Sequence, residues 1–219
     1  MSNVPDYERE EYSAQGFVNE YLDRRISAEG MMWWQRPDRA YEPRSAHNAL
    51  SEVCRIFEER NAQELSMLVR ILLNGDDHTQ FTYNRYVEVV DTMHKNQDEG
   101  AVQMPYGRLV ALMAFAGLVS LKLIRNNCPQ AVADIAVYTG RYLERAIRQQ
   151  WPIANRSWTG FVQMSRVMIQ RHIVKRERER AVEKRRQLLF GATALCAALG
   201  VGFYAWKFSD KLPCIVLCE

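Results

Sequence analysis

Histidine and cysteine are among the side chains of this chain that could ligate a metal ion, and their spacing argues against a metal site. The four histidines lie in different segments, and no two of them stand at the spacing that brings two imidazoles to one ion. Asp76-Asp77-His78 could attract a cation, but it follows Asn74-Gly75, which is typical of a turn. We therefore expect neither a metal ion nor another cofactor.

Covalent catalysis is equally unsupported by the sequence. The five cysteines are odd in number, scattered and without a Cys-x-x-Cys pair, which indicates free thiols in a reducing compartment. The sequence contains no motif typical of a serine or cysteine nucleophile and no glycine-rich loop that would cradle a phosphate. We predict that the protein is not an enzyme.

The chemistry that remains is recognition. Gly107 and Arg108 place a bare backbone and a permanent positive charge at the start of the most apolar stretch before the C-terminal tail. This combination at the edge of a core is the functional signal of the sequence. Taken alone, the pair also fits a helix-packing glycine followed by a surface arginine that is paired with a glutamate.

The element that positions this pair is a helix predicted from Met104 to Lys122. Pro105 suits a first helical turn, and from Leu109 to Leu121 only Ser120 interrupts the apolar run. A helix that is apolar on every face belongs inside a protein core or a bilayer. The run of thirteen residues would span about 20 Å, too short for a bilayer of about 30 Å. We therefore predict the central helix of a bundle.

Apolar residues at helical spacing predict further helices on both sides of the central one, and no segment alternates with a period of two. The predicted helices cover about 17–26, 47–60, 65–73, 81–94 and 130–150, and a short amphipathic helix opens at 155–161. The fold class is therefore all-α. The net charge of +3 is too small to indicate nucleic acid as a partner, and it is unevenly spread: 171–186 carries eight Lys/Arg against three Asp/Glu, so the rest of the chain is slightly acidic.

The C-terminal segment differs in kind from the rest. Leu188 to Trp206 gives nineteen residues without a charge, between Arg185-Arg186 and Lys207, which meets the criteria for one membrane-spanning helix. We predict a disordered N-terminus (1–13), a helical domain (14–170), a basic juxtamembrane segment (171–187), a transmembrane tail anchor (188–206) and a short tail beyond the membrane (207–219). A buried core helix is the less favoured alternative for the anchor.

These features together resemble the Bcl-2 family of apoptosis regulators. Tyr106-Gly107-Arg108 with the run to Val119 is similar to the first homology region of the family, and Asn155-Arg156-Ser157-Trp158 with Phe161 to the second. The family form generally reads Asn-Trp-Gly-Arg and Gly-Gly-Trp, and the departures here resemble a nematode survival member. Gly16-Phe17-Val18 with Tyr21 also matches a fourth homology region.

The resemblance implies a Bcl-2-like helical bundle with a groove that receives the amphipathic helix of a BH3-only death protein. In the groove, Arg108 would bond an aspartate of the ligand, worth roughly 1.5–3 kcal/mol. The implied groove residues are Tyr106, Gly107, Arg108, Val110, Ala111, Phe115, Val87, Val90, Leu68 and Trp158. The helix implied for the fourth homology region carries Phe17, Val18, Tyr21, Leu22 and Ile26. Trp158 is expected to pack at the end of the groove rather than to contact the ligand.

A segment similar to the third homology region indicates whether the protein promotes cell survival or acts as a pore-forming effector. Its implied residues are Leu50, Val53, Cys54, Arg55 and Phe57. Pore-forming effectors of the family carry Gly-Asp where this chain has Cys54-Arg55, and Arg55 would repel Arg108 of a second copy. We therefore expect a survival protein rather than an effector.

The resemblance also implies partners and a location. They are a BH3-only protein, an Apaf-type adaptor ATPase that activates caspases, and the mitochondrial outer membrane, with the domain facing the cytosol; the endoplasmic reticulum is a second possible membrane. A pore-forming effector and a tail-anchored scaffold without a groove ligand are the alternatives.

Overall fold

The structure, a computed structural model, describes residues 12–38, 44–73, 83–95 and 104–209, with the backbone alone for 93–95 and 185–209. The turn at Asp76-Asp77-His78 lies outside these residues, as do all but two residues of the predicted disordered N-terminus and the end of the predicted tail beyond the membrane. Contacts divide the chain into two compact units, Met1–Gln170 and Arg171–Glu219.

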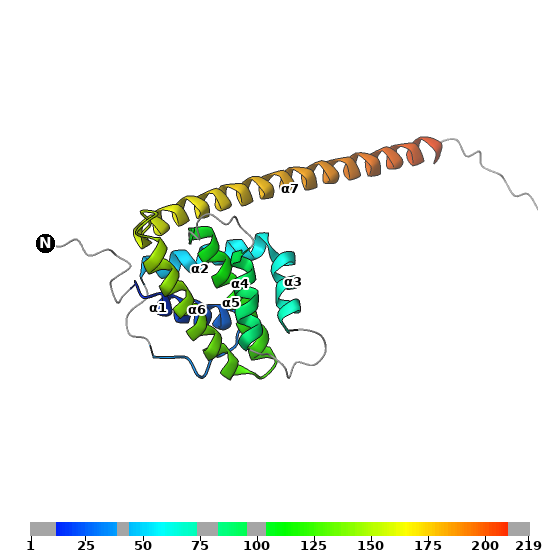
Figure 1. The fold of residues 1–219 in the computed structure, drawn as a ribbon. Helices are drawn as coiled ribbons and strands as arrows, with labels where there is room; N and C mark the ends of the chain where they lie inside the picture. The colour runs from blue at the N-terminus through cyan, green and yellow to red at the C-terminus, as the bar shows by residue number, and fades with distance from the viewer. Residues whose placement is uncertain (1–11, 39–43, 74–82, 96–103, 210–219) are drawn as a thin grey trace, which may run out of the picture. The chain divides into compact units, whose positions relative to one another are not determined.

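The described residues form helices and no strand, as predicted for an all-α protein (Figure 1). The elements are α1 (Ala14–Ser27), α2 (Ser45–Arg60), α3 (Ala62–Leu73), α4 (Tyr83–Lys95), α5 (Tyr106–Arg125), α6 (Pro129–Gln150) and α7 (Trp158–Ser209).

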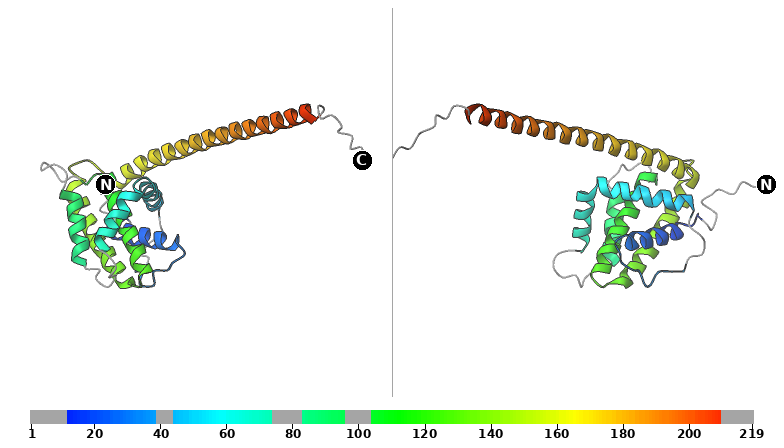
Figure 2. Two further views of the ribbon diagram at one scale, coloured as in Figure 1. Left: turned by 90° about the vertical axis from the view of Figure 1, so that its right-hand side faces the viewer. Right: turned by 180° about the vertical axis from the view of Figure 1, so that it is seen from behind.

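Helix α5 is the centre of the first unit, packed against α1, α2, α3 and α6 (Figures 1 and 2). It has 20 residues, and a helix of that length extends about 30 Å. The predicted helix, Met104–Lys122, agrees with these bounds to within three residues at each end, and the estimate of about 20 Å applied only to its apolar run. By length and composition α5 could cross a membrane. Its apolar window is 67% buried by the rest of the protein, which identifies it as the predicted core helix. The side chains of Leu188–Trp206 are not among the described residues, so the tail anchor stays a prediction.

Helix α1 is capped at both ends and is hydrogen-bonded to α6. Ser13 caps α1 by accepting a hydrogen bond from Gly16 N at 3.1 Å, and Gly30 takes a left-handed φ of +72° just past the helix end. α1 packs on α6, where the Ala14 N–H donates to Glu144 Oε2 at 3.0 Å and Gln15 Nε2 donates to the Ala136 carbonyl at 3.0 Å. All five apolar residues predicted for the fourth homology region are buried in this helix.

Helix α7 runs without a break from Trp158 to Ser209. The short helix predicted at 155–161, the basic segment and the segment predicted as the anchor are therefore parts of one helix. The basic segment does not interrupt it because Arg, Lys and Glu are good helix formers, and pairs such as Lys175 Nζ–Glu179 Oε1 (3.7 Å) add to the helix. Residues 158–209 contain no proline, so no residue forces the helix to end within this segment.

Candidate ligand-binding groove

Gly107 and Arg108 lie in the first turn of α5, where the sequence placed them. Pro105 precedes the helix, and its carbonyl accepts from the Arg108 N–H at 3.0 Å. Gly107 is exposed, and no atom lies within 4 Å of the position that a Cβ would occupy. Because nothing packs against it, Gly107 is not a helix-packing glycine. The surface beside Arg108 is open to an approaching backbone.

Arg108 is half-buried and acts on a tyrosine of α6. Burial raises the pKa of Tyr142, the Asp91 carboxylate of α4 raises it further, and the Arg108 guanidinium lowers it. One acidic and one basic group from two helices therefore act on the same phenol. This electrostatic setting lies where α4, α5 and α6 meet.

The predicted groove residues divide by exposure into two sets. Leu68, Val87 and Ala111 are half-buried on α3, α4 and α5, so part of each side chain reaches solvent. Val90, Val110 and Phe115 are buried. An apolar ligand could therefore touch the first set as the protein stands, whereas the second set supports the surface from below.

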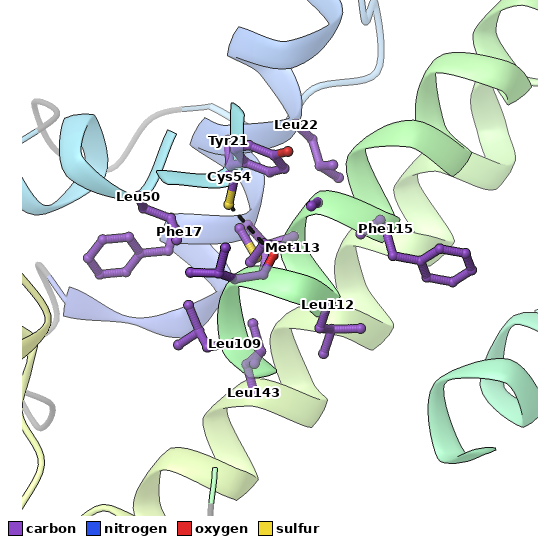
Figure 3. Close-up of a cluster of buried hydrophobic side chains, with 14 of the residues drawn as sticks. Phe17, Tyr21, Leu22, Leu50, Cys54, Leu109, Leu112, Met113, Phe115 and Leu143 are labelled. Carbon is purple, nitrogen blue, oxygen red and sulfur yellow. Dashed lines mark hydrogen bonds between the residues drawn. The ribbon is translucent and has the colours of Figure 1, made fainter. Parts of the chain in front are cut away.

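Phe115 points away from the side of α5 that faces α1 and α2. Figure 3 shows Leu109 and Met113 directed toward Phe17, while the Phe115 ring lies on the opposite side of the helix. There it stacks on Tyr86 of α4 with ring centroids 5.7 Å apart and an interplanar angle of 1°. Tyr86 is fixed in turn because its hydroxyl shares a hydrogen bond with Thr139 Oγ1 at 2.8 Å. The wall between α4 and α5 is thus an aromatic stack.

Helix α3 carries two exposed apolar residues that the sequence analysis missed. Met67 and Ile71 are 56% and 54% exposed, although Leu65 and Leu72 of the same helix are buried. Met67 and Ile71 stand one turn apart, so they form a second apolar stripe on α3. That stripe was visible in the sequence as apolar residues on both faces of a short helix, which is typical of a helix with a partner on each side.

Trp158 lies in the core rather than in an open groove. Its ring stacks on Phe17 of α1 at 3.8 Å, and Phe17 stacks on His47 of α2 at 4.1 Å. Trp151 meets Trp158 edge-on at 5.0 Å. Trp158 therefore joins the start of α7 to α1 and α2, in agreement with the packing role expected for it.

Tyr106 joins the start of α5 to the start of α7. Its hydroxyl donates to the Ser157 carbonyl at 2.9 Å and accepts from the Ser157 N–H at 3.1 Å. Ser157 caps α7, because its Oγ accepts from the Gly160 N–H at 3.0 Å. Asn155 has a φ of +50°, which turns the chain into this cap. The second homology region is therefore a helix start that is held by the first.

The segment similar to the third homology region forms α2 and is mostly enclosed. Leu50, Val53 and Cys54 are buried, Phe57 is half-buried, and Arg55 is exposed. The Cys54 thiol points to the Val110 carbonyl of α5 at 3.8 Å (Figure 3). Arg55 pairs with Glu52 at 2.6 Å and with Glu59 on its own helix. The enclosed side of α2 therefore packs on α5, and Arg55 lies on the exposed side of α2.

Within the described residues, no group of three or more His, Cys, Asp and Glu side chains is arranged to hold a metal ion.

Comparisons with known proteins agree with this architecture. A family model described as "Apoptosis regulator proteins, Bcl-2 family" matches residues 50–158. The apoptosis regulator ced-9 of Caenorhabditis elegans is 28% identical over 207 residues, which cover 90% of this chain and 70% of the relative. Its namesake in Caenorhabditis briggsae is 27% identical over 195 residues, which cover 89% and 72%. A chain in the crystal structure of a CED-9/EGL-1 complex is 28% identical and superposes with a TM-score of 0.70 over 76% of this chain and 99% of that one.

Proposed function

The chain belongs to the Bcl-2 family of apoptosis regulators, and from this premise we propose that it is a survival protein that captures BH3-only death ligands in a groove along α3, α4 and α5. The similarity of its fold to a chain solved in a CED-9/EGL-1 complex supports a ligand of this class. In such binding, an amphipathic helix lays apolar side chains spaced three and four residues apart into an apolar groove.

The observation that carries the proposal is the open surface at Gly107 beside Arg108. Apart from the chain neighbours of Gly107 and the backbone of α5, no atom lies within 4 Å of the Gly107 Cβ position. This leaves room for a ligand helix to bring its backbone against α5. Arg108 then offers a bidentate partner for the aspartate of the ligand. Met67, Ile71 and the partly exposed set on α3, α4 and α5 supply apolar surface for the other face of the ligand helix.

Titration with a labelled BH3-only peptide tests this proposal. The full chain, purified in mild detergent, is expected to bind the peptide, and Arg108→Glu is expected to abolish binding because it sets a carboxylate against the aspartate of the ligand. Arg125→Glu is the matched control, since Arg125 lies at the far end of the same helix and pairs there with Glu29 at 2.8 Å. Equal loss of binding in both variants would contradict a site at Arg108.

Survival rather than killing is supported by α2. The Cys54-Arg55 pair replaces the Gly-Asp that effectors present to a second copy, and Arg55 is already satisfied by Glu52 and Glu59. Self-association through α2 and Arg108 would bring two arginines together, which is unfavourable. If the purified protein, triggered by the peptide, released dye from liposomes on its own, the effector function would replace the survival function.

An adaptor and a membrane complete the proposal. We place the domain on the cytosolic face of the mitochondrial outer membrane through Leu188–Trp206, holding an Apaf-type adaptor ATPase that the BH3-only ligand releases. Deleting 188–219 is expected to make the protein diffuse in cells, and residual membrane binding would rule out this segment as the sole anchor. Adaptor bound to the full chain is expected to dissociate when the peptide is added. An adaptor that stays bound, or never binds, would favour a scaffold.

A further inference from the structure

Two segments that are far apart in sequence are tied together at one end of the proposed groove. The Tyr106 hydroxyl bonds both the N–H and the carbonyl of Ser157, 51 residues away. A second tie joins the same segments, because Trp151 Nε1 donates to the Met104 carbonyl at 3.1 Å. The turn before α7 therefore cannot shift against the turn before α5 without breaking hydrogen bonds.

The Tyr106 ring is held in place by its neighbours. Trp151 and Phe161 meet the ring edge-on, with centroids at 5.4 Å and 5.6 Å. Gly160 leaves room for the hydroxyl, since a Cβ at that position would lie 2.6 Å from the Tyr106 oxygen. The Tyr106 hydroxyl therefore has two backbone partners, two aromatic rings hold its ring in place, and Gly160 leaves space for it. Together these contacts fix the position of the hydroxyl.

The position of this contact gives it a consequence for binding. Tyr106 precedes Gly107 and Arg108 in the first turn of α5, so the hydroxyl fixes the turn that carries both ligand-facing residues. Nothing covers Gly107, so no side chain has to leave before a ligand approaches. Fixing such a site before binding lowers the ordering cost that the ligand would otherwise meet.

We infer that Tyr106 is a positioning residue of the groove: its hydroxyl bridge to Ser157 locks α7 against the Gly107–Arg108 turn and lengthens the residence time of a bound death helix. The inference rests on the proposed function. Tyr106 itself was expected among the groove residues, and in this role it acts on the ligand through the turn that it holds.

Dissociation of a fluorescent amphipathic peptide with a Leu-x-x-x-Gly-Asp sequence from the full chain in mild detergent tests this role. Tyr106→Phe keeps the ring and removes the bridge. Because a hydrogen bond contributes about 0.5–1.5 kcal/mol, we expect the dissociation rate to rise about 2- to 13-fold. Tyr21→Phe is the matched control: it also removes one hydroxyl, which bonds Glu58 at 2.7 Å on another surface. It is expected to lower the melting temperature while leaving dissociation unchanged.

Gly160→Ala provides an independent variant. Its Cβ would displace the Tyr106 hydroxyl, so faster dissociation is expected here too. The double variant combines Tyr106→Phe with Gly160→Ala, so the hydroxyl that the new Cβ would meet is gone. The closest remaining neighbours of that Cβ are Ser157 Oγ at 3.4 Å and Cζ of the residue 106 ring at 3.7 Å, which are ordinary contacts. The double variant should therefore dissociate no faster than Tyr106→Phe alone.

The results of these dissociation experiments distinguish the proposed function from the inference about Tyr106. No peptide binding by the wild type would overturn the proposed function and the inference with it. Wild-type binding with unchanged or slower dissociation in Tyr106→Phe would overturn the inference alone, and so would additive effects of the two substitutions.

Discussion

The Tyr21 hydroxyl of α1 donates a hydrogen bond to Glu58 Oε1 of α2 at 2.7 Å. Arg25 pairs with the same carboxylate, with its NH2 group 2.9 Å from Oε2. Burial raises the pKa of Tyr21 well above its ordinary range, and the charge of Glu58 adds to the effect, so the phenol stays protonated and donates. One carboxylate thus holds two successive turns of α1 on the end of α2.

Removing that carboxylate should cost stability. Glu58→Ala leaves the buried Tyr21 hydroxyl without its acceptor and leaves Arg25 with Glu29 as its remaining ion-pair partner at 2.8 Å, so we expect the free energy of unfolding to fall by about 1–3 kcal/mol. Glu59→Ala is the matched control on the same helix, where an exposed pair with Arg55 is worth less than about 1 kcal/mol. Thermal unfolding followed by circular dichroism measures both. A Glu58 variant as stable as the Glu59 variant would contradict the role assigned to Glu58.

Two glycines of α5 should respond oppositely to alanine. Gly107→Ala meets open space, so stability should be unchanged or up to about 1 kcal/mol higher, while BH3-only peptide binding weakens because the methyl group keeps the ligand backbone away. Gly117→Ala would place a Cβ 2.9 Å from the Tyr21 ring and should lower the free energy of unfolding by about 1–3 kcal/mol. Melting temperatures and peptide titrations of both variants give the comparison. Unweakened binding by Gly107→Ala would show that no ligand lies against this residue.

Stability should fall in mild acid because of His47. Burial lowers the pKa of this imidazole to about 4, whereas it titrates near 6.5 in the unfolded chain. Above pH 6.5 both states are neutral; between pH 6.5 and 4 the unfolded state gains a proton that the folded state refuses. The free energy of unfolding should therefore drop by up to about 1.4 kcal/mol per pH unit. Melting temperatures from pH 8 to 4 measure this loss. In His47→Gln it should be smaller, and equal slopes would contradict the assignment.

Cys54 reports whether α2 stays in the bundle. Its thiol is buried, and burial raises its pKa, so it should alkylate far more slowly than the half-buried Cys128. In a survival protein that only captures ligands, adding the peptide should leave Cys54 protected. Site-resolved mass spectrometry after brief alkylation measures this. Rapid labelling of Cys54 with peptide present would mean that α2 leaves the bundle, and it would contradict simple capture of the ligand.

Periodic apolar residues were enough to predict most of the helices. The central helix, α1 and α2 were placed within a few residues of their observed bounds, because each buries one stripe or all of its surface. The sequence analysis predicted a helix at 155–161 and a spanning helix at 188–206 but did not join them into α7, because a change of composition from apolar to basic does not show whether the helix continues.

The candidate site was only partly accessible from sequence. Gly107 and Arg108 were recognised because glycine beside a fixed charge at a helix start is unusual. The bridge between Tyr106 and Ser157 depends on two segments meeting in space, and no local pattern encodes that meeting. The exposure of Met67 and Ile71 likewise depends on which face of α3 the other helices cover.

The packing of α1 on α6 determines when the fold can close during synthesis. The ribosome releases Ala14 first, yet its partner Glu144 follows 130 residues later. When α5 emerges, α1, α2 and α3 are available to cover it but α6 is not, so the faces of α1 and α5 that pack on α6 are still uncovered. A nascent chain that exposes this apolar surface is expected to bind chaperones that hold apolar helices. Its release from them should coincide with the emergence of α6, when α1 finds its binding surface and α5 is enclosed.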